Sequence, residues 1–224
     1  PILEECEGLL CVDLLRRSGV EVTIAAVGGE KIVKSARSIS VVADALAEEL
    51  DYSAFDAAIL PGGIPGVDNL KADATVRKVC TVPLIVKLSP QAESIPEMCK
   101  AVEAAGADAI SLCNTFQACA IDLEKRRPVF NNIFAGLSGP AVRPIALRMV
   151  WQAVGAVNIP VVGLGGIATG RDALEFIMAG ATAVQVGAAN FANPRAMETI
   201  AEEMAAWMDA HGVKTLDEIR GCAR

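Results

Sequence analysis

The sequence predicts an α/β fold in which parallel strands alternate with helices. Short apolar runs alternate with helix-length segments, and glycine-rich turns follow several of those runs. An internal echo supports the same fold, since AGADAISL at residues 105–112 and AGATAVQV at residues 179–186 each join a helix end, a glycine and a buried strand. The repetition favours a succession of βα units of one architecture.

The first third of the chain predicts an incomplete series of such units. Residues 4–18 have the apolar spacing of a helix, and Gly19 stops it before the β-rich VEVTIAAV. Short β-like pieces follow at residues 31–42, and residues 43–50 predict a brief helix. An apolar strand at residues 57–60 ends in LPGGIPG, and a further helix follows with Val67, Leu70, Val76 and Val79 on its inner face.

From residue 82 the chain predicts four βα units in succession. Strands are expected in VPLIVKLSP (82–90), in ADAISLCNT (107–115), at residues 158–164 and before Gly187. Helices are expected at residues 95–105, 140–156, 170–179 and 194–211, and a short terminal turn at TLDEI. The long segment at residues 115–139 is expected to be functional or to form a structure of its own, such as a hairpin.

Composition favours a globular protein with a small-molecule partner. The 224 residues are 53% hydrophobic, enough for one barrel-sized core or two smaller ones. The 20 basic and 27 acidic residues give a net charge of −7 without a basic run, which argues against nucleic acid or an anionic membrane surface as partner. The most apolar run, residues 150–168, is interrupted by polar residues, Pro160 and glycines, so it does not predict a membrane span.

The cysteines and the first residues favour a cytoplasmic location. Seven cysteines form an odd set without a CxxC pair, which is typical of reduced thiols. Glu4, Glu5 and Glu7 stand where a signal peptide would carry basic residues. We therefore expect a soluble cytoplasmic protein.

Two glycine-ended strands lie one βα unit apart in residues 161–190. Both turns are expected at the carboxyl edge of a parallel sheet, where the backbone N–H groups of Gly165, Gly166, Gly187 and Ala188 can converge on an anion such as a phosphate. The alternative is that these glycines only make tight turns, which are common in α/β proteins.

Three polar residues are expected at the same edge. Lys87 closes a buried strand, where its ammonium could stabilise negative charge on a bound ring system; alternatively it extends past the strand into solvent. Asn114 and Thr115 end the next strand and offer an amide and a hydroxyl to a polar substrate, or else they cap their own loop.

Other familiar catalytic sets are missing from the sequence pattern. His211, the single histidine, lies late in the last helix and is expected at the surface. We find no paired carboxylates, zinc-ligand spacing or Ser/His/Asp set, so the pattern gives little support to hydrolysis and none to a metal site.

The first third resembles the ThiJ/PfpI family of flavodoxin-like proteins. The similarity rests on EECEGLLCVDLLRRSGVEVTIAAVGGEK (4–31) and DAAILPGGIPGVDNLKAD (56–73). The first strand of that family and its nucleophile-elbow cysteine have no counterpart here. Glu7 matches the glutamate that the family places beside the cysteine, but a solvated carboxylate at a helix N-terminus explains it better.

The remainder resembles the C-terminal half of the FMN-dependent dihydroorotate dehydrogenases. The matching segments are VPLIVKLSP, ADAISLCNT, residues 126–150 and residues 159–194. The similarity is to the soluble bacterial class whose catalytic subunit works with an iron-sulfur and FAD electron-transfer subunit. It implies a half-barrel of the TIM type, FMN as cofactor, and dihydroorotate and orotate as substrate and product.

This resemblance also implies roles for particular residues. Lys87 would contact the flavin ring, and Ser138 with Gly139 would lie against it. Asn114 and Thr115 would contact the orotate ring. The FMN phosphate would be cradled by four residues, Gly165, Gly166, Gly187 and Ala188.

Several departures from that pattern bear on activity. Gln91 stands where the family usually has Asn, and Ala188 replaces a threonine in its GTAN motif, a lost hydroxyl bond of about 1 kcal/mol or roughly fivefold in affinity. None of the seven cysteines stands in a motif that matches the active-site base of this class. The catalytic residues are therefore unassigned, and impaired turnover is expected.

Together these observations predict a fusion of two pieces: residues 1–80, a flavodoxin-like ThiJ/PfpI fragment, and residues 81–224, a dehydrogenase-like half-barrel. We expect one barrel-like parallel sheet, with an open doubly wound sheet as the alternative. The expected function is that of an FMN-binding oxidoreductase related to dihydroorotate dehydrogenase, which supplies pyrimidine biosynthesis. The alternatives are a non-catalytic chimeric scaffold and a ThiJ-type deglycase or hydrolase; a homo-oligomer or an electron-transfer subunit is the expected protein partner.

Overall fold

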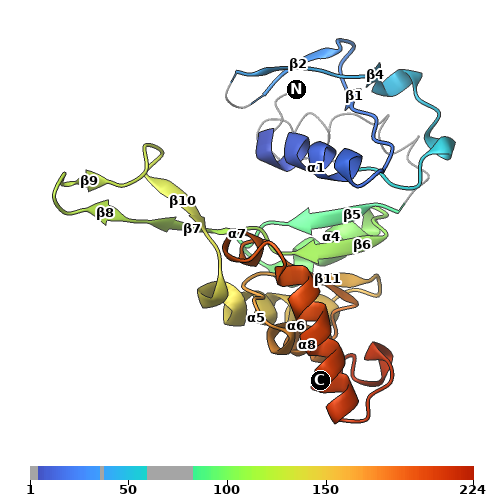
Figure 1. The fold of residues 1–224 in the computed structure, drawn as a ribbon, viewed down its shortest axis with the longest axis vertical. Helices are drawn as coiled ribbons and strands as arrows, with labels where there is room; N and C mark the ends of the chain where they lie inside the picture. The colour runs from blue at the N-terminus through green and yellow to red at the C-terminus, as the bar shows by residue number, and fades with distance from the viewer. Residues whose placement is uncertain (1–4, 36–37, 60–82) are drawn as a thin grey trace. The chain divides into compact units, whose positions relative to one another are not determined.

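The computed structural model describes residues 5–35, 38–59 and 83–224 and divides into two compact units (Figure 1). The first unit is Pro1–Leu84 and the second is Ile85–Arg224. No helix in the described ranges is long and apolar enough to cross a membrane.

The described part of the first unit combines one helix with short strands. Its described elements are α1 (Glu5–Arg17), β1 (Ala25–Ala26), β2 (Ile32–Lys34), β3 (Ser40–Val42), β4 (Ala45–Leu46) and two 3₁₀ turns (Ala47–Glu49 and Tyr52–Ala54). β1 pairs with β4 in parallel, and β2 pairs with β3 in antiparallel orientation. A small core forms around Ala26, Val33 and Ala43.

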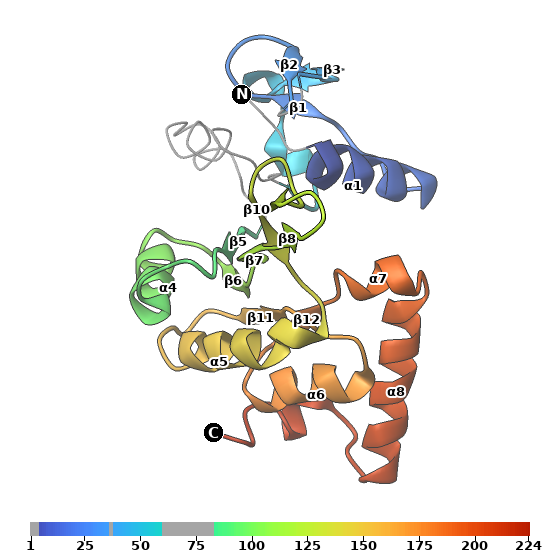
Figure 2. The same cartoon turned by 90° about the vertical axis from the view of Figure 1, so that its left-hand side faces the viewer.

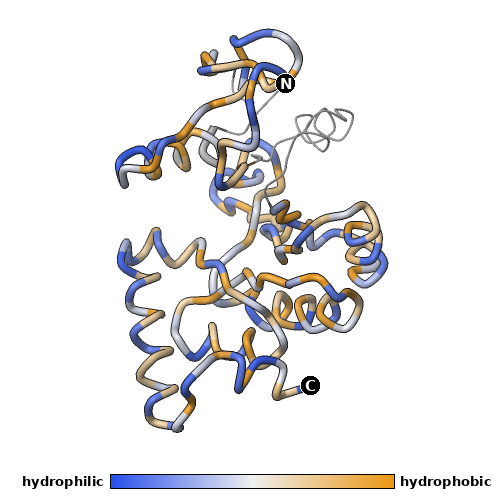
Figure 3. Tube along the Cα trace, turned by 90° about the vertical axis from the view of Figure 1, so that its right-hand side faces the viewer, coloured by the Kyte–Doolittle hydropathy of each residue, from blue (hydrophilic) through white to orange (hydrophobic). Residues whose placement is uncertain are grey.

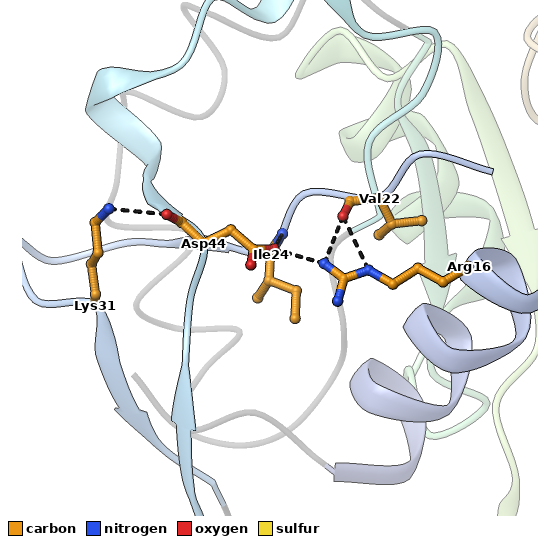
Figure 4. Close-up of polar contacts among 5 residues, drawn as sticks. All are labelled: Arg16, Val22, Ile24, Lys31 and Asp44. Carbon is orange, nitrogen blue, oxygen red and sulfur yellow. Dashed lines mark hydrogen bonds and ion pairs between the residues drawn. The ribbon is translucent and has the colours of Figure 1, made fainter. Parts of the chain in front are cut away.

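A polar network joins α1 to the segments that lead into β1 and β4 (Figure 4). Arg16 donates from Nη2 to the Val22 carbonyl at 2.7 Å and to the Asp44 carboxylate at 2.8 Å. The backbone N–H of Ile24 donates to the same carboxylate, and this bond, helped by Arg16, holds the pKa of Asp44 below its usual value. Since both side chains are about half exposed, the network fixes geometry more than it adds stability.

The helix expected at residues 4–18 is confirmed as α1, whereas the helix expected at residues 43–50 is wrong. That segment forms β4 and a 3₁₀ turn, because the N–H groups of Asp44 and Ala45 donate to the Ile24 carbonyl and draw it into strand pairing. Residues 57–59 form no regular element. The LPGG turn and the helix expected after it lie outside the described residues.

The second unit is built on a four-stranded parallel sheet. Its strands are β5 (Ile85–Leu88), β6 (Ala109–Leu112), β11 (Val161–Leu164) and β12 (Ala183–Gln185), in the order β12-β11-β6-β5. The register pairs Lys87 with Ser111 and Leu164 with Gln185. The expected succession of parallel βα units from residue 82 is therefore present.

Helices pack on one face of this sheet. They are α4 (Ile95–Ala104), α5 (Arg143–Val154) and α6 (Gly170–Met178), followed by α7 (Ala189–Ala192) and α8 (Ala196–Ala210). α5 contacts both α4 and α6, so the three form a row, and α8 packs on α6 (Figure 2). Gly163 shows which face is covered, because a Cβ built on it would lie 2.6 Å from Phe176 of α6.

The buried core of the second unit lies between the sheet and these helices. Its fully buried members include Ile110, Leu112, Met149, Val150 and Phe176. Hydrophobic colour accordingly runs along the strands and the helices packed on them, whereas α8 mixes hydrophobic and hydrophilic segments (Figure 3). The core therefore holds the strand ends of the second unit in place.

An antiparallel arm interrupts the βα succession after β6. It consists of β7 (Phe116–Cys119), β8 (Ile121–Asp122), β9 (Arg127–Pro128) and β10 (Phe134–Leu137). β7 pairs with β10 and β8 with β9, which confirms the hairpin expected within residues 115–139. At its end a 3₁₀ turn, Pro140–Val142, leads into α5.

The expected single barrel-like sheet does not occur among the described strands, which form five separate sheets. The four parallel strands of the second unit make an open sheet, and the strands of the first unit pair only with one another. Each described strand of the first unit finds a partner on one edge within the same unit.

Candidate functional site

The carboxyl ends of the four parallel strands gather the candidate residues at one edge of the second unit. Because Leu164 pairs with Gln185, the turns that follow β11 and β12 begin side by side. The N–H of Asn114 donates to the Leu88 carbonyl at 3.2 Å and that of Cys113 to the Leu164 carbonyl at 3.0 Å. The loops after β5, β6 and β11 are thereby tied together.

The Gly165–Gly166 turn requires glycine. Gly165 has φ 131° and Gly166 has φ 75°, a region that side chains disfavour. A Cβ on Gly166 would lie 2.7 Å from the backbone nitrogen of Arg143 and 2.8 Å from the Gly139 carbonyl oxygen. The turn after β11 is therefore in direct contact with the Ser138–Gly139 turn that precedes α5.

The second glycine turn is open. A Cβ on Gly187 would meet nothing within 4 Å. Within the described residues, no hydrogen bond outside the helices and strands uses the N–H of Gly165, Gly166, Gly187 or Ala188. Four unengaged donors at two adjacent turns, with space beside one of them, suit a phosphate-sized anion.

The helix that follows does not offer its own N-terminus to such an anion. Asp172 of α6 accepts from the N–H groups of Ala168 and Thr169 at 3.0 and 2.9 Å, and Glu203 of α8 accepts from the N–H of Gly170 at 2.6 Å. Carboxylates thus accept from the N–H groups of the two residues before α6 and from that of Gly170, so the donors left for an anion are mainly those of the glycine turns.

Lys87 lies on the sheet face away from the helices. Its register partner Ser111 is buried and donates from Oγ to Gln185 Oε1 at 2.7 Å, across β11, which lies between β6 and β12. The Lys87 side chain is exposed, as its solvent-directed alternative requires, and its ammonium acts electrostatically on Cys113. The Lys87 side chain is therefore accessible from solvent and lies near the carboxyl ends of the strands.

Cys113 is a buried thiol within this edge. It is 3% exposed, and burial raises its pKa to about 11, although the charge of Lys87 opposes the shift. Its Sγ lies 3.9 Å from the Leu164 carbonyl oxygen. At neutral pH the thiol is protonated, so it is a packing group and not a nucleophile.

Asn114 and Thr115 are exposed at the base of the arm. Asn114 Oδ1 accepts from the N–H of Thr115 at 2.9 Å, which is the loop-capping alternative for this pair. No hydrogen bond from the Asn114 Nδ2 amino group is found in the described part of the chain. The amide therefore caps its loop with one end and keeps donors for a ligand at the other.

Other residues singled out in the sequence belong to the end of α8, to α1 and to the loop after β5. His211 ends α8, where it stacks on Trp207 with ring centroids 3.9 Å apart. Glu7 lies in α1, and its side chain is outside the description. Gln91 Nε2 donates to Gln117 of β7 at 3.4 Å, beside the base of the arm. Among the described side chains no group of three or more histidines, cysteines or carboxylates could hold a metal ion.

Sequence reasoning missed four polar residues of this region: Ser111, Gln185, Arg143 and Asp172. Arg143 forms ion pairs with Asp172 and Glu175, and Asp172 also completes a capping box with Thr169. The spacing of Thr169 and Asp172 is a signal that could have been found. The Ser111–Gln185 bond has no such signal, because it joins residues 74 positions apart.

Comparison with known proteins matches most of this chain to one family. A sequence model described as dihydroorotate dehydrogenase matches residues 18–208. The dihydroorotate dehydrogenase B (NAD(+)) catalytic subunit of Petrotoga mobilis is 58% identical over 146 residues, which are 65% of this chain and 49% of that protein. The corresponding subunit of Geotalea uraniireducens is 56% identical over 146 residues, 65% of this chain and 48% of the relative.

A third relative extends the similarity toward the N-terminus. The catalytic subunit of the same name from Geobacter sulfurreducens is 48% identical over 196 residues, or 86% of this chain and 64% of its own length. The chain spans about half the length of the first two relatives.

Proposed function

Because this chain belongs to the dihydroorotate dehydrogenase family, we propose that its second unit binds FMN and serves the oxidation of dihydroorotate to orotate in pyrimidine biosynthesis. One observation carries the proposal. At the carboxyl edge of the sheet, two adjacent glycine turns present four backbone N–H groups that have no hydrogen-bond partner among the described residues, and the space beside Gly187 is open. The residues present therefore fit the phosphate end of that cofactor.

Each candidate residue has a role in this proposal. The N–H groups of Gly165, Gly166, Gly187 and Ala188 bind the phosphate. Lys87 approaches the flavin ring, and its ammonium stabilises negative charge there. The remaining residues are Ser138 and Gly139 against the flavin, and Asn114 and Thr115 against the substrate ring.

The bound flavin would supply two-electron redox chemistry, and this chain supplies positioning. Asn114 is already oriented by its bond to the Thr115 N–H, so its Nδ2 group can donate to a carbonyl of the substrate without a further loss of freedom. The hydrogen bond from buried Ser111 to exposed Gln185 stiffens the sheet face on which Lys87 lies.

A visible spectrum of the purified protein, followed by titration with FMN, tests the proposal. We expect either a yellow protein or one that takes up added FMN at one per chain. A colourless protein whose tryptophan fluorescence and melting temperature do not respond to FMN contradicts it. Riboflavin, which lacks the phosphate, should bind more weakly if the glycine turns make the contact.

We further infer that these 224 residues alone turn over dihydroorotate slowly. No cysteine here matches the motif of the active-site base, and loss of a general base typically costs about 10²- to 10⁴-fold in rate. The measurement is single-turnover reduction of bound FMN by dihydroorotate, followed by the bleaching of the flavin absorbance. A rate ordinary for the relatives would show the inference wrong.

Assembly and location are part of the same proposal. The named relatives are catalytic subunits, so an electron-transfer subunit is the protein partner we propose, alongside self-association. Co-purification with the corresponding subunit of a relative tests the first, and sedimentation tests the second. The five described cysteines have free thiols, which supports a reducing, cytoplasmic location.

The N-terminal unit carries a second candidate reading. The structure divides between Leu84 and Ile85, which supports a separate ThiJ/PfpI-type piece in residues 1–80. The family match from residue 18 favours the opposite view. A non-catalytic chimeric scaffold would have the same melting temperature with and without FMN. A ThiJ-type deglycase would consume methylglyoxal and lose that activity when all seven cysteines are replaced.

A further inference from the structure

We propose that Arg143 is a positioning residue of the phosphate turns, acting through Asp172; this inference rests on the proposed FMN site. Arg143 begins α5, directly after the Ser138–Gly139 turn and the 3₁₀ turn. Its guanidinium pairs with Asp172 of α6 and lies 3.7 Å from Glu175. It therefore bridges the two βα units on either side of β11.

Asp172 transmits this contact to the Gly165–Gly166 turn. Its Oδ2 accepts from Ala168 and Thr169, the residues that lead from the turn into α6, while Oδ1 faces Arg143. Asp172 is 7% exposed, so its position is fixed by packing as well as by these bonds. The Arg143 guanidinium therefore contacts the Asp172 carboxylate, and that carboxylate binds the backbone N–H groups that follow the glycine turn.

The backbone of Arg143 also contacts the Gly165–Gly166 turn directly. The Cβ position of Gly166 is 2.7 Å from the Arg143 nitrogen and 2.8 Å from the Gly139 carbonyl oxygen. A shift of the N-terminus of α5 would therefore displace the glycine turn directly. Both the side chain and the main chain of Arg143 hold that turn.

Charge gives Arg143 a second effect on an anion. Three carboxylates surround the start of α6, those of Asp172, Glu175 and Glu203. Arg143 is the cation paired with the first two, and no other cation pairs with any of the three within the described ranges. Its removal would leave the site for a phosphate dianion both looser and more negative.

The test compares FMN with riboflavin, because the positioned turns contact only the phosphate. Dissociation constants are measured from flavin fluorescence for the wild type, Arg143→Ala and Arg143→Lys. Loss of a partly buried charge-assisted contact should weaken FMN binding about tenfold in Arg143→Ala, with riboflavin changed less than about twofold. Arg143→Lys should recover part of the loss. Arg148→Ala, on an exposed turn of α5, is the matched control and should leave both constants unchanged.

Asp172→Asn separates positioning from charge. It removes a negative charge, so a purely electrostatic role predicts tighter FMN binding, whereas positioning through the carboxylate predicts weaker binding. Arg143→Ala added to Asp172→Asn should then have less effect than in the wild type. Tighter FMN binding by Asp172→Asn would overturn the positioning role.

A measurement without cofactor guards against a simple folding defect. Amide exchange at Ala168 and Thr169 should accelerate in Arg143→Ala, while exchange in the β6 core keeps its wild-type protection. Equal losses for FMN and riboflavin, or unchanged exchange at those amides, would overturn this inference alone. A wild-type protein that binds riboflavin but gains nothing from the phosphate would overturn the proposed cradle and this inference together.

Discussion

Two buried thiols in the second unit, Cys99 and Cys113, are the residues with the largest shifts in acidity. Burial raises the pKa of each to about 11 from a model-peptide value of 9.0. A raised pKa means that the folded protein holds the proton more tightly than the unfolded chain. The stabilisation is complete below pH 9 and is lost as pH rises from 9 toward 11.

We therefore expect stability to fall at alkaline pH by up to about 1.4 kcal/mol per pH unit for each thiol. Urea unfolding followed by tryptophan fluorescence at pH 8 and pH 10 measures the loss. Cys113→Ala should show a smaller decline between these two pH values, whatever its stability at pH 8. Identical declines in the wild type and this variant would mean that the Cys113 thiol is not responsible.

The glycine turns allow folding and ligand binding to be separated at single residues. Gly166→Ala combines a positive φ with backbone contacts below 3 Å, so it should destabilise the second unit by about 1–3 kcal/mol. Gly187→Ala enters open space and should change stability by less than about 0.5 kcal/mol. If the phosphate occupies that space, Gly187→Ala should nevertheless weaken FMN binding. A stable Gly187→Ala with wild-type FMN affinity would exclude this space as part of the site.

Sequence reasoning could place residues at strand ends but not pair them. Lys87 and Asn114 follow from where apolar strands stop, and the structure puts both at the carboxyl edge. The partners of Ser111 and Arg143 could not be predicted, because each pairing depends on how separate elements are aligned. The sequence does contain the Thr169–Asp172 capping box, since it is a local spacing.

At the scale of elements, apolar periodicity predicted helices correctly where the tertiary packing also favours a helix. The helices expected at residues 95–105 and 170–179 occur as α4 and α6, within one residue at each end. The helix prediction for residues 43–50 was wrong, because pairing with the strand at Ala25–Ala26 outweighed local helix propensity. For residues 115–139 the sequence predicted either a functional segment or a structure of its own, such as a hairpin. It could not decide for the hairpin, because the paired strands are separated by 14 residues.

The contact between β11 and α6 gives an element-scale prediction. Gly163→Ala would place a methyl group 2.6 Å from the ring of Phe176, a fully buried side chain, and should cost about 1–3 kcal/mol through overpacking. Gly155→Ala is the control, because its Cβ would approach closely only the end of the Arg224 side chain, at 2.8 Å, and would meet the Gln152 and Trp151 carbonyl oxygens at an ordinary 3.7 Å. Chemical denaturation of both variants measures the difference. Equal stabilities would show that the sheet and α6 adjust without cost.

At the scale of the molecule, the division into two units makes tryptophan a selective probe. Both tryptophans, Trp151 and Trp207, lie in the second unit, whereas the single tyrosine, Tyr52, lies in the first. FMN at 100 times its dissociation constant should stabilise the second unit by about 2.7 kcal/mol, or on the order of 5–10 °C in the tryptophan-detected melt. If FMN raised the melting temperature only when unfolding was followed through Tyr52, the FMN site would lie in the first unit, contrary to the proposal.

The sequence by itself determined the order of βα units, the family and the glycine turns, because apolar runs and glycines act over a few neighbouring residues. Only the tertiary structure decided that the described strands of the two units form separate sheets, with an open four-stranded sheet in the second unit. It also decided that the Gly139 and Gly166 turns touch and that Arg143 pairs with Asp172. These contacts depend on strand register and helix packing, which no local spacing encodes.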